Sequence, residues 1–336
     1  MGDGSNPRTG RRPTINDVAR RAEVSPAAVS KVLRDAYGVS PAMRQRVSAA
    51  VADLGYRPML SARSMRTATR TLGISSLNPR NPFLPMLLDG VAQESGRRGY
   101  SSFITLTELD GASQLQSARS MVDRQMDGVI LITPTMGPAD LELLAAEVPV
   151  VVVGLHGEGG SYDSVASDDA LGSELMVDHL VARGHRRILF HTQPTRVPGL
   201  PEEHRVSGFR RATARHGVEG EVVEGAWTTE GGAALAASLA GLQDPPTAVH
   251  AGADVAALGM LSWLWAHARR VPEDLAVVGC DDIPASGLEP ISLTTVDQQA
   301  DRMGRLAVEL LVERLGGRAD AQHLLVAPEL RVRRSA

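Results

Sequence analysis

Apolar side chains recur at helical spacing in the first sixty residues and predict three short helices. The first is expected to begin at Thr14, which can form a capping box with Asp17. After a tight turn, Ser25 followed by Pro26 starts the second, because serine is a favoured N-cap and proline is tolerated at the first helical position. A third helix is expected over 40–55, where another Ser-Pro pair starts the periodic segment and a glycine ends it.

The second helix is predicted to turn small side chains and a cation outward. Its apolar positions face the interior, which leaves Ala27, Ala28 and Lys31 outside, with Arg34 free to follow them. Small residues at the leading end of a helix and a cation further along suit insertion into the DNA major groove. The alternative is an ordinary helical hairpin inside a core. The pattern favours a helix-turn-helix DNA-binding domain over 14–58.

From Thr71 onward, short apolar runs alternate with amphipathic stretches. Runs that are buried on both sides and followed by helices indicate parallel sheets with right-handed crossovers, and two doubly wound lobes fit better than one large sheet. Strands are expected at 72–77, 103–108, 128–134, 149–155, 187–192, 247–253, 275–282 and 292–298. Helices are expected at 85–98, 113–125, 170–183, 202–216, 231–239, 254–269 and 299–315.

These patterns predict a small all-α head and a large α/β core. The polar residues 1–13 are expected to form a disordered arm. The segment 59–70 has a helix-compatible composition but is too short to be a stable helix alone, so it is interpreted as a linker. The core is expected over 71–336, with lobe 1 at about 71–170 and 297–322, and lobe 2 at about 171–296 and 323–336.

Charge separates the same two parts of the chain. Residues 1–70 hold 13 Lys and Arg against 5 Asp and Glu, whereas the rest holds 22 against 34. A basic head on an acidic body locates the phosphate-binding surface in the first seventy residues. No apolar run approaches the length of a membrane span, and the polar N-terminus does not resemble a secretory signal.

Residue usage argues against several enzyme classes. Cys280 is the single cysteine, which excludes an internal disulfide and a Cys-pair zinc site, and Lys31 is the single lysine, which excludes a P-loop, Schiff-base or pyridoxal lysine. An enzyme would have to use Asp281, His191 or His204 as acid–base groups, and no nucleophile–base pairing or metal-ligand spacing supports it. No cofactor, metal or catalytic residue is expected.

The motifs in order along the chain closely resemble the LacI/GalR family of bacterial transcriptional regulators. The resemblance rests on TINDVARRAEVSPAAVSKVL, VSPAMRQRVSAAVADLGYRP, ARSMR, NPFLPMLLDGV, MDGVILITP, VASDDALG, HLVARGHRRILF, HRVSGFRRA, ADVAALGML, VPEDLAVVGCDD and LTTVDQ. It implies a cytoplasmic homodimer, nucleoid-associated when bound, that recognises a palindromic operator on double-stranded DNA. It also implies a hinge helix after the head, and a core like a periplasmic sugar-binding protein. A small molecule, expected to be a carbohydrate, would bind in the cleft between the lobes and change operator affinity. The regulator itself is expected to be a repressor.

The resemblance also implies which residues contact DNA. Ser25 would meet a phosphate, while Pro26, Ala27 and Lys31 occupy base-reading positions. Met65 falls where relatives wedge a leucine into the minor groove, and methionine can serve as such an apolar wedge. The full predicted DNA-binding set is Thr14, Ser25, Pro26, Ala27, Ala28, Ser30, Lys31, Arg34, Tyr56, Arg57, Ala62 and Met65.

The predicted effector-binding set follows in the same way: Phe83, Leu84, Asp168, Arg205, Trp227 and Asp281. Arginine and aspartate can donate to and accept from a polyhydroxyl ligand, and tryptophan offers a flat apolar face. Ala253 stands where the family often has asparagine, which removes a side-chain amide from a standard monosaccharide site. A DNA-binding regulator whose core serves only dimerisation remains the alternative.

Overall fold

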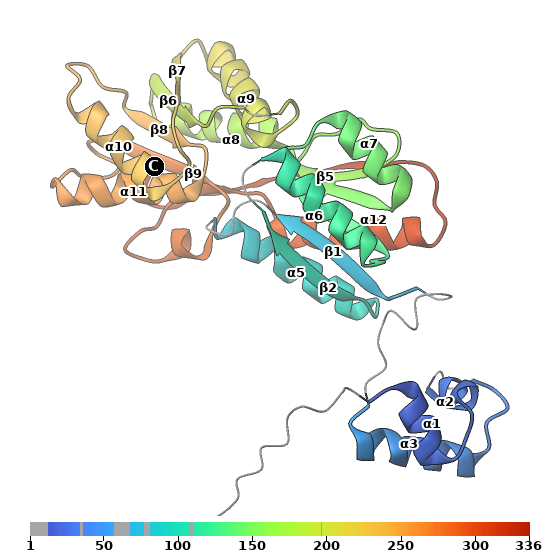
Figure 1. The fold of residues 1–336 in the computed structure, drawn as a ribbon. Helices are drawn as coiled ribbons and strands as arrows, with labels where there is room; N and C mark the ends of the chain where they lie inside the picture. Colours follow the sequence, from blue (N-terminus) through green and yellow to red (C-terminus); the bar gives the residue numbers. More distant parts are fainter. Residues whose placement is uncertain (1–12, 34–35, 57–67, 77–80, 108–109, 196) are drawn as a thin grey trace, which may run out of the picture. The chain divides into compact units, whose positions relative to one another are not determined.

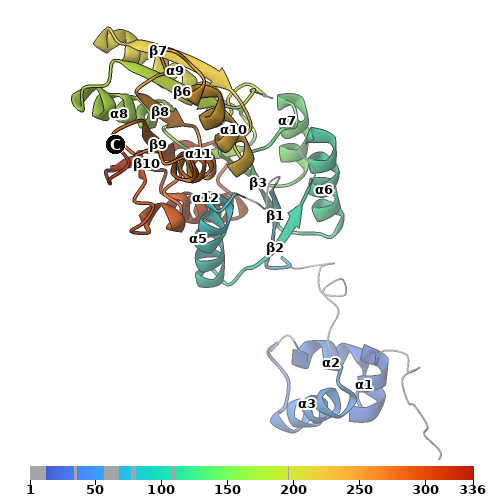
Figure 2. The same cartoon turned by 90° about the vertical axis from the view of Figure 1, so that its left-hand side faces the viewer.

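The computed structural model describes residues 13–33, 36–56, 68–76, 81–107, 110–195 and 197–336. The chain forms two compact units, 1–69 and 70–336, drawn in Figures 1 and 2. The predicted arm, except Pro13, and most of the predicted hinge segment lie outside the described residues.

The head consists of the three helices predicted from the sequence: α1 (Ile15–Ala22), α2 (Pro26–Leu33) and α3 (Pro41–Leu54). The capping box at the start of α1 is confirmed, since the Asp17 carboxylate accepts from the Thr14 amide at 2.8 Å. Ser40 caps α3, and Gly55 ends it with the positive φ that favours glycine. Fully buried valines from the three helices form the centre of the head, Val18, Val29 and Val47.

The core contains two six-stranded sheets, one per lobe, which confirms the predicted pair of doubly wound lobes. Lobe 1 has the strand order β11-β5-β4-β3-β1-β2, and lobe 2 has β12-β10-β9-β8-β6-β7. All neighbours pair in parallel except β10 and β12, which are antiparallel. Because the strands are parallel, each sheet gathers strand carboxyl ends along one edge.

Lobe 1 comprises β1 (Thr71–Ser76), α5 (Phe83–Arg97), β2 (Ser101–Leu106), α6 (Gly111–Asp123), β3 (Gly128–Ile132), α7 (Pro138–Glu147), β4 (Val150–Val153), β5 (Asp163–Ser167), α12 (Ala300–Leu315) and β11 (His323–Val326). Lobe 2 comprises α8 (Asp169–Ala182), β6 (Arg187–Thr192), α9 (Pro201–His216), β7 (Glu219–Glu224), α10 (Thr229–Ala240), β8 (Ala248–Ala251), α11 (Asp254–Ala266), β9 (Ala276–Cys280), a short 3-10 turn (Pro284–Gly287), β10 (Thr294–Asp297) and β12 (Glu329–Arg331).

The chain passes between the lobes after β5, after β10 and after β11. The prediction that lobe 2 resumes at residue 323 was therefore wrong, because β11 pairs with β5 in the sheet of lobe 1. Only β12 returns to lobe 2. The strand was overlooked because it lies at a sheet edge and its side chains are mostly exposed or half-buried, so it lacks the apolar run of a central strand.

Three helix pairs pack backbone against backbone through glycines. A Cβ at Gly90 of α5 would overlap the main-chain oxygen of Asp301 in α12. The same holds for Gly208 of α9 against Ala170 of α8, and for Gly232 of α10 against α11. These glycines are required by close approach of the helices rather than by backbone conformation.

Candidate functional site

The outward face of α2 carries the residues predicted to read DNA. Pro26, Ala27 and Lys31 are exposed, while Ala28 and Ser30 are half-buried. The Ser25 hydroxyl accepts from the Ala28 amide at 3.2 Å and so caps the helix. The buried valines of α2 hold this face outward.

The other predicted DNA contacts divide into two groups. Thr14 is engaged in the capping box of α1, and Tyr56 packs half-buried against the head core. The remaining four lie outside the described residues and stay predictions: Arg34, Arg57, Ala62 and Met65.

A cavity of about 670 Å³ lies between the lobes and is lined from both. Its wall includes Phe83 and Leu84 at the start of α5 in lobe 1, and Arg205, Trp227 and Asp281 from lobe 2. The Asn81 side chain accepts from the Phe83 amide at 3.0 Å and so fixes the start of α5 at the cavity. Five of the six predicted effector residues therefore line one cavity.

Asp168, the sixth predicted effector residue, does not line the cavity in this structure, so its contact with an effector stays a prediction. Its carboxylate accepts from the Leu171 amide at 3.0 Å and caps α8. The neighbouring Asp169 lines the cavity instead. Successive residues at a helix start point in different directions, so the apolar pattern could not decide between the two aspartates.

A buried ion pair organises the lobe 2 wall of the cavity. The Arg205 Nε donates to Asp169 Oδ1 at 2.8 Å, and its Nη1 donates to the main-chain oxygen of Gly252. Burial alone would lower the pKa of Arg205, but surrounding negative groups, including Asp169, raise it above its ordinary value. The guanidinium is therefore charged in the cavity wall. His156 Nε2 lies 2.9 Å from the other Asp169 oxygen.

Trp227 is half-buried and fixed against this ion pair. Its indole Nε1 donates to the main-chain oxygen of His191 at 3.2 Å, and the Arg205 guanidinium lies 5.1 Å from the ring centroid. Gly252 lies against the indole, and a Cβ there would overlap the ring. Ala253, which follows it, also lines the cavity but offers only a methyl group.

Asp281 follows β9 and reaches the cavity from a strained main-chain conformation, with φ at 134°. Its Oδ1 accepts from Gln298 at 2.6 Å, whereas its buried Oδ2 has no hydrogen-bond partner. Burial raises the pKa of Asp281 to about 8.

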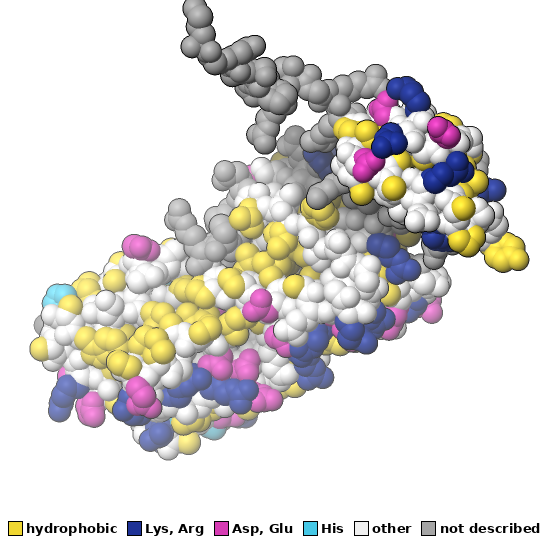
Figure 3. Space-filling view, turned by 90° about the horizontal axis from the view of Figure 1, so that it is seen from below, with side chains coloured by type: hydrophobic (Ala, Val, Ile, Leu, Met, Phe, Trp, Pro, Cys, Tyr) yellow, Lys and Arg dark blue, Asp and Glu magenta, His cyan; other side chains and the backbone are white. Residues whose placement is uncertain are grey.

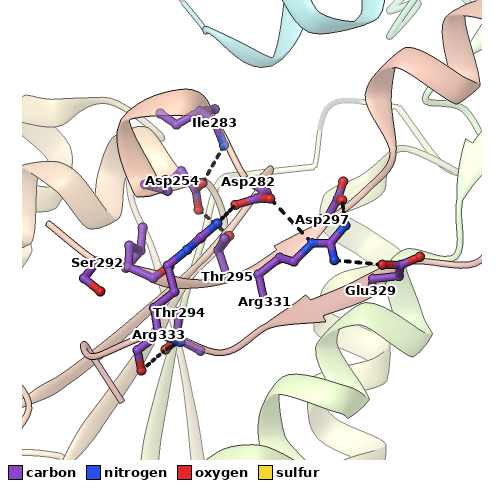
Figure 4. Close-up of polar contacts among 12 residues, drawn as sticks. Asp254, Asp282, Ile283, Ser292, Thr294, Thr295, Asp297, Glu329, Arg331 and Arg333 are labelled. Carbon is purple, nitrogen blue, oxygen red and sulfur yellow. Dashed lines mark hydrogen bonds and ion pairs between the residues drawn. The ribbon is translucent and has the colours of Figure 1, made fainter. Parts of the chain in front are cut away.

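The next residue, Asp282, forms ion pairs with residues near the end of the chain, as Figure 4 shows. Its carboxylate pairs with Arg333 at 2.7 Å. Arg331 on β12 pairs with Asp297 at 2.7 Å. Buried Asp254 accepts from the Ile283 amide at 3.0 Å and from the Thr295 hydroxyl at 2.6 Å. These contacts hold the loop after β9, and with it Asp281, against the end of the chain.

Sequence reasoning missed several polar residues of the cavity wall. Glu202, the most buried carboxylate among them, stands three positions before Arg205 on α9, so helical spacing could have indicated that both share a face. Four polar atoms in the wall are buried without a partner: Thr135 Oγ1, Ser167 Oγ, Glu202 Oε1 and Asp281 Oδ2. Unpaired buried polar atoms are costly, so they mark places where a polar ligand gains hydrogen bonds.

His191 and His204, the two histidines considered as acid–base groups of an enzyme, do not line the cavity. Both ring nitrogens of buried His191 lack partners, and burial lowers its pKa to about 4. His204 stacks on His156 with ring centroids 3.7 Å apart. Among the described residues no group of His, Cys, Asp and Glu is arranged to hold a metal ion. Within the same residues, no helix has the length and apolar character needed to cross a membrane.

Comparison with known proteins agrees with this geometry. Residues 14–59 match the model of bacterial regulatory proteins of the lacI family, and residues 177–336 match a periplasmic binding protein-like domain. The ribose operon repressor of Escherichia coli (strain K12) is 32% identical over 330 residues, which cover 96% of this chain and 99% of that protein.

Two solved structures share the fold over nearly the whole chain. A complex of the transcriptional regulator CelR with cellobiose is 30% identical, with a TM-score of 0.71, covering 97% of this chain and 100% of that one. The lac repressor dimer bound to operator and the anti-inducer ONPF is 24% identical, with a TM-score of 0.84, covering 97% and 99%. On the agreement of its head, its core and its relatives, the chain belongs to the LacI family of bacterial regulatory proteins.

Proposed function

We propose that this protein is an operator-binding transcriptional repressor controlled by a small polyhydroxylated effector, a sugar or sugar derivative, in the cavity between its lobes. The observation that carries the proposal is the set of four unpartnered polar atoms in a cavity that also offers an aromatic face. Hydroxyl groups of a ligand can pair with such atoms, and Trp227 supplies an apolar surface for a sugar ring. The names of two relatives support this class, since one represses a ribose operon and another was solved with cellobiose.

Control by the effector requires two core arrangements that bind it unequally. The cavity wall is drawn from both lobes, so a change in lobe spacing changes the contacts available to the ligand. The alternative regulator, whose core serves only dimerisation, gives no account of a cavity with a charged arginine and unpartnered polar atoms in its wall.

Recognition of a palindromic operator requires two heads, and we propose that the core brings two copies together through β2. This edge strand exposes three large apolar side chains, Phe103, Ile104 and Leu106, each about half accessible. Figure 3 views the core from the side on which α5 and β2 lie in Figure 1, and apolar side chains gather there. An exposed apolar edge of this kind is typical of an interface. The lac repressor structure with the same fold is a dimer.

Sedimentation and operator titration test the dimer. Phe103→Glu is expected to yield monomers and to weaken operator binding strongly. Leu143→Glu, a matched change at an exposed apolar residue of α7 in the same lobe, is expected to leave both unchanged. A Phe103→Glu protein that still sediments as a dimer would contradict the assignment of β2.

The effector is tested by fluorescence anisotropy of full-length protein on operator DNA, with ribose, cellobiose and related sugars added. A sugar that binds saturably and shifts operator affinity is the expected result. If sugars bind without changing operator affinity, the core is only a dimerisation body and the regulatory proposal fails. Binding in the nucleoid implies a cytoplasmic location, which fluorescence microscopy of a tagged protein can check.

The hinge completes the proposal, although Met65 and Ala62 lie outside the described residues. Met65 is proposed to wedge into the central base step of the operator and bend it. Met65→Ala is expected to reduce specific affinity and bending, whereas Met65→Leu is expected to be close to neutral. Unchanged bending by Met65→Ala in a gel-shift assay would refute the wedge.

A further inference from the structure

Two carboxylates in the cavity wall are buried with an oxygen that has no partner. Asp281 is 3% exposed and Glu202 is 2% exposed. Asp281 Oδ2 and Glu202 Oε1 both lack a hydrogen bond, and both residues line the cavity. Gln298 donates to the other oxygen of Asp281, but each unpartnered buried oxygen still carries the cost of its lost hydration until a donor, and best a cationic one, reaches it.

The charges of the cavity wall are unbalanced. Four carboxylates are found among its described residues, Asp169, Glu202, Glu224 and Asp281, against the single guanidinium of Arg205. That guanidinium is already paired with one of the four carboxylates, because its Nε donates to Asp169, and its Nη1 donates to a main-chain oxygen. The described wall therefore holds more acidic groups than cationic ones, and a bound cation would find several carboxyl groups to pair with.

Burial shifts the protonation of both Asp281 and Glu202. Burial raises the pKa of Asp281 to about 8; nearby Arg205 opposes the rise, and Asp254 adds to it. Burial also raises the pKa of Glu202. Arg205 also opposes the rise for Glu202, and a bound cation would favour the charged form of either group further.

We propose that the effector carries a cationic amine beside its hydroxyl groups, as an amino sugar or aminocyclitol does, and that Asp281 holds the ammonium while Glu202 accepts a second donor. This inference rests on the proposed function, because it names the chemical class that the regulatory cavity selects. A phosphorylated sugar is disfavoured, because the described wall offers a phosphate a single cation, Arg205, which already pairs with Asp169.

A neutral sugar would satisfy the unpartnered oxygens only in part. Its hydroxyls can donate to a carboxylate or accept from a carboxylic acid, so binding would leave the protonation of Asp281 nearly unchanged. An ammonium, in contrast, favours the ionised carboxylate and expels its proton. Proton release on binding therefore separates the two ligand classes.

Isothermal titration calorimetry of the full-length protein tests the inference with matched ligands at neutral pH. The panel is glucose, glucosamine and phosphorylated glucose, together with the corresponding forms of galactose and ribose. Within at least one sugar series, the amine is expected to bind roughly tenfold or more tightly than the neutral parent, since a charge-assisted hydrogen bond replaces a neutral one. Titrations in two buffers of different ionisation enthalpy should show proton release for the amine.

Two variants test whether Asp281 is the residue that selects the amine and releases the proton. Asp281→Asn is expected to bring the amine-to-neutral affinity ratio close to one and to remove the proton release. Glu221→Gln, which neutralises an exposed carboxylate on β7 outside the cavity wall, should keep both. Thermal unfolding of each variant checks that the core is folded.

Several outcomes would overturn the inference. They are a neutral parent that binds as tightly as its amine, an amine that binds without proton release, binding of the phosphorylated sugars, and a panel in which no amine binds. If a neutral sugar binds and shifts operator affinity, only the amine assignment fails and the proposed function stands. If no member binds and none shifts operator affinity, the effector part of the proposed function fails as well.

Discussion

Replacing Arg205 by methionine removes one partner of the ion pair that organises the cavity. Asp169 and Arg205 are both almost fully buried, and their contact is 2.8 Å long. The substitution leaves Asp169 with His156 as its remaining side-chain partner in the structure. Breaking a buried ion pair by removing one member costs about 3–5 kcal/mol, because an uncompensated buried charge remains. The main-chain oxygen of Gly252 also loses its donor, which adds about 1 kcal/mol.

The expected consequence is a less stable core that no longer responds to effector. In a large domain each kcal/mol lowers the melting temperature by about 2–4 °C, so the core transition should fall by about 8–24 °C. Differential scanning calorimetry of the full-length protein measures this. Operator affinity, assayed well below the transition, should stay near wild type, because Arg205 lies in the cavity wall and outside the DNA-binding head.

A double variant separates charge imbalance from general loss of packing. Arg205→Met combined with Asp169→Leu removes both charges, so most of the lost stability should return while effector binding stays absent. A single variant that melts within two or three degrees of wild type, or a double variant that is less stable than the single one, would refute the reasoning.

The remaining predictions concern packing, pH and DNA. Gly90→Ala should destabilise lobe 1 by about 1–3 kcal/mol or more in urea denaturation, whereas Gly96→Ala in open space on the same helix should stabilise it by about 0.5–1 kcal/mol. The raised pKa of Asp281, about 8, stabilises the fold below its unfolded value near 4, and this contribution is lost as pH rises towards 8. Asp281→Asn should therefore gain stability relative to wild type as pH rises from 5 to about 8, and a constant difference would contradict this. Lys31→Ala should weaken specific operator binding by about 1–3 kcal/mol and relax discrimination at one base, and an equal loss on random DNA would instead assign Lys31 to a phosphate.

Local signals were sufficient for the head, because caps are decided by neighbouring residues. Thr14, Ser40 and Gly55 each end or begin a helix where the sequence indicated. The residues of the cavity wall were harder to predict from the sequence, since they come from segments far apart in the chain. The resemblance supplied five of its residues, but it could not separate Asp168 from Asp169, whose roles depend on direction at a helix start.

Exposure explains three of the strands that are absent from the list expected from the sequence, whereas the buried strand β5 lacks an apolar run because three of its five residues are polar. Strands β7, β11 and β12 lie at sheet edges and are largely exposed or half-buried, so they lack the continuous apolar runs of the central strands. Helix α7 has no well-separated apolar stripe, with Leu143 exposed between the buried Leu141 and Leu144. Glu202 was missed because a carboxylate in the first turn of a helix is ordinarily explained by the helix dipole.

The glycine-packed helix pairs couple residues of the cavity wall to the passages between the lobes. Arg205 lies on α9, which is locked to α8, and α8 begins directly after the first passage between the lobes. Phe83 starts α5, which is locked to α12, and α12 begins just after the second passage. Contact between main chains leaves no room for one helix to slide or bend alone. We therefore expect a ligand that shifts either residue to move the whole helix pair, and with it the passage between the lobes where that pair begins.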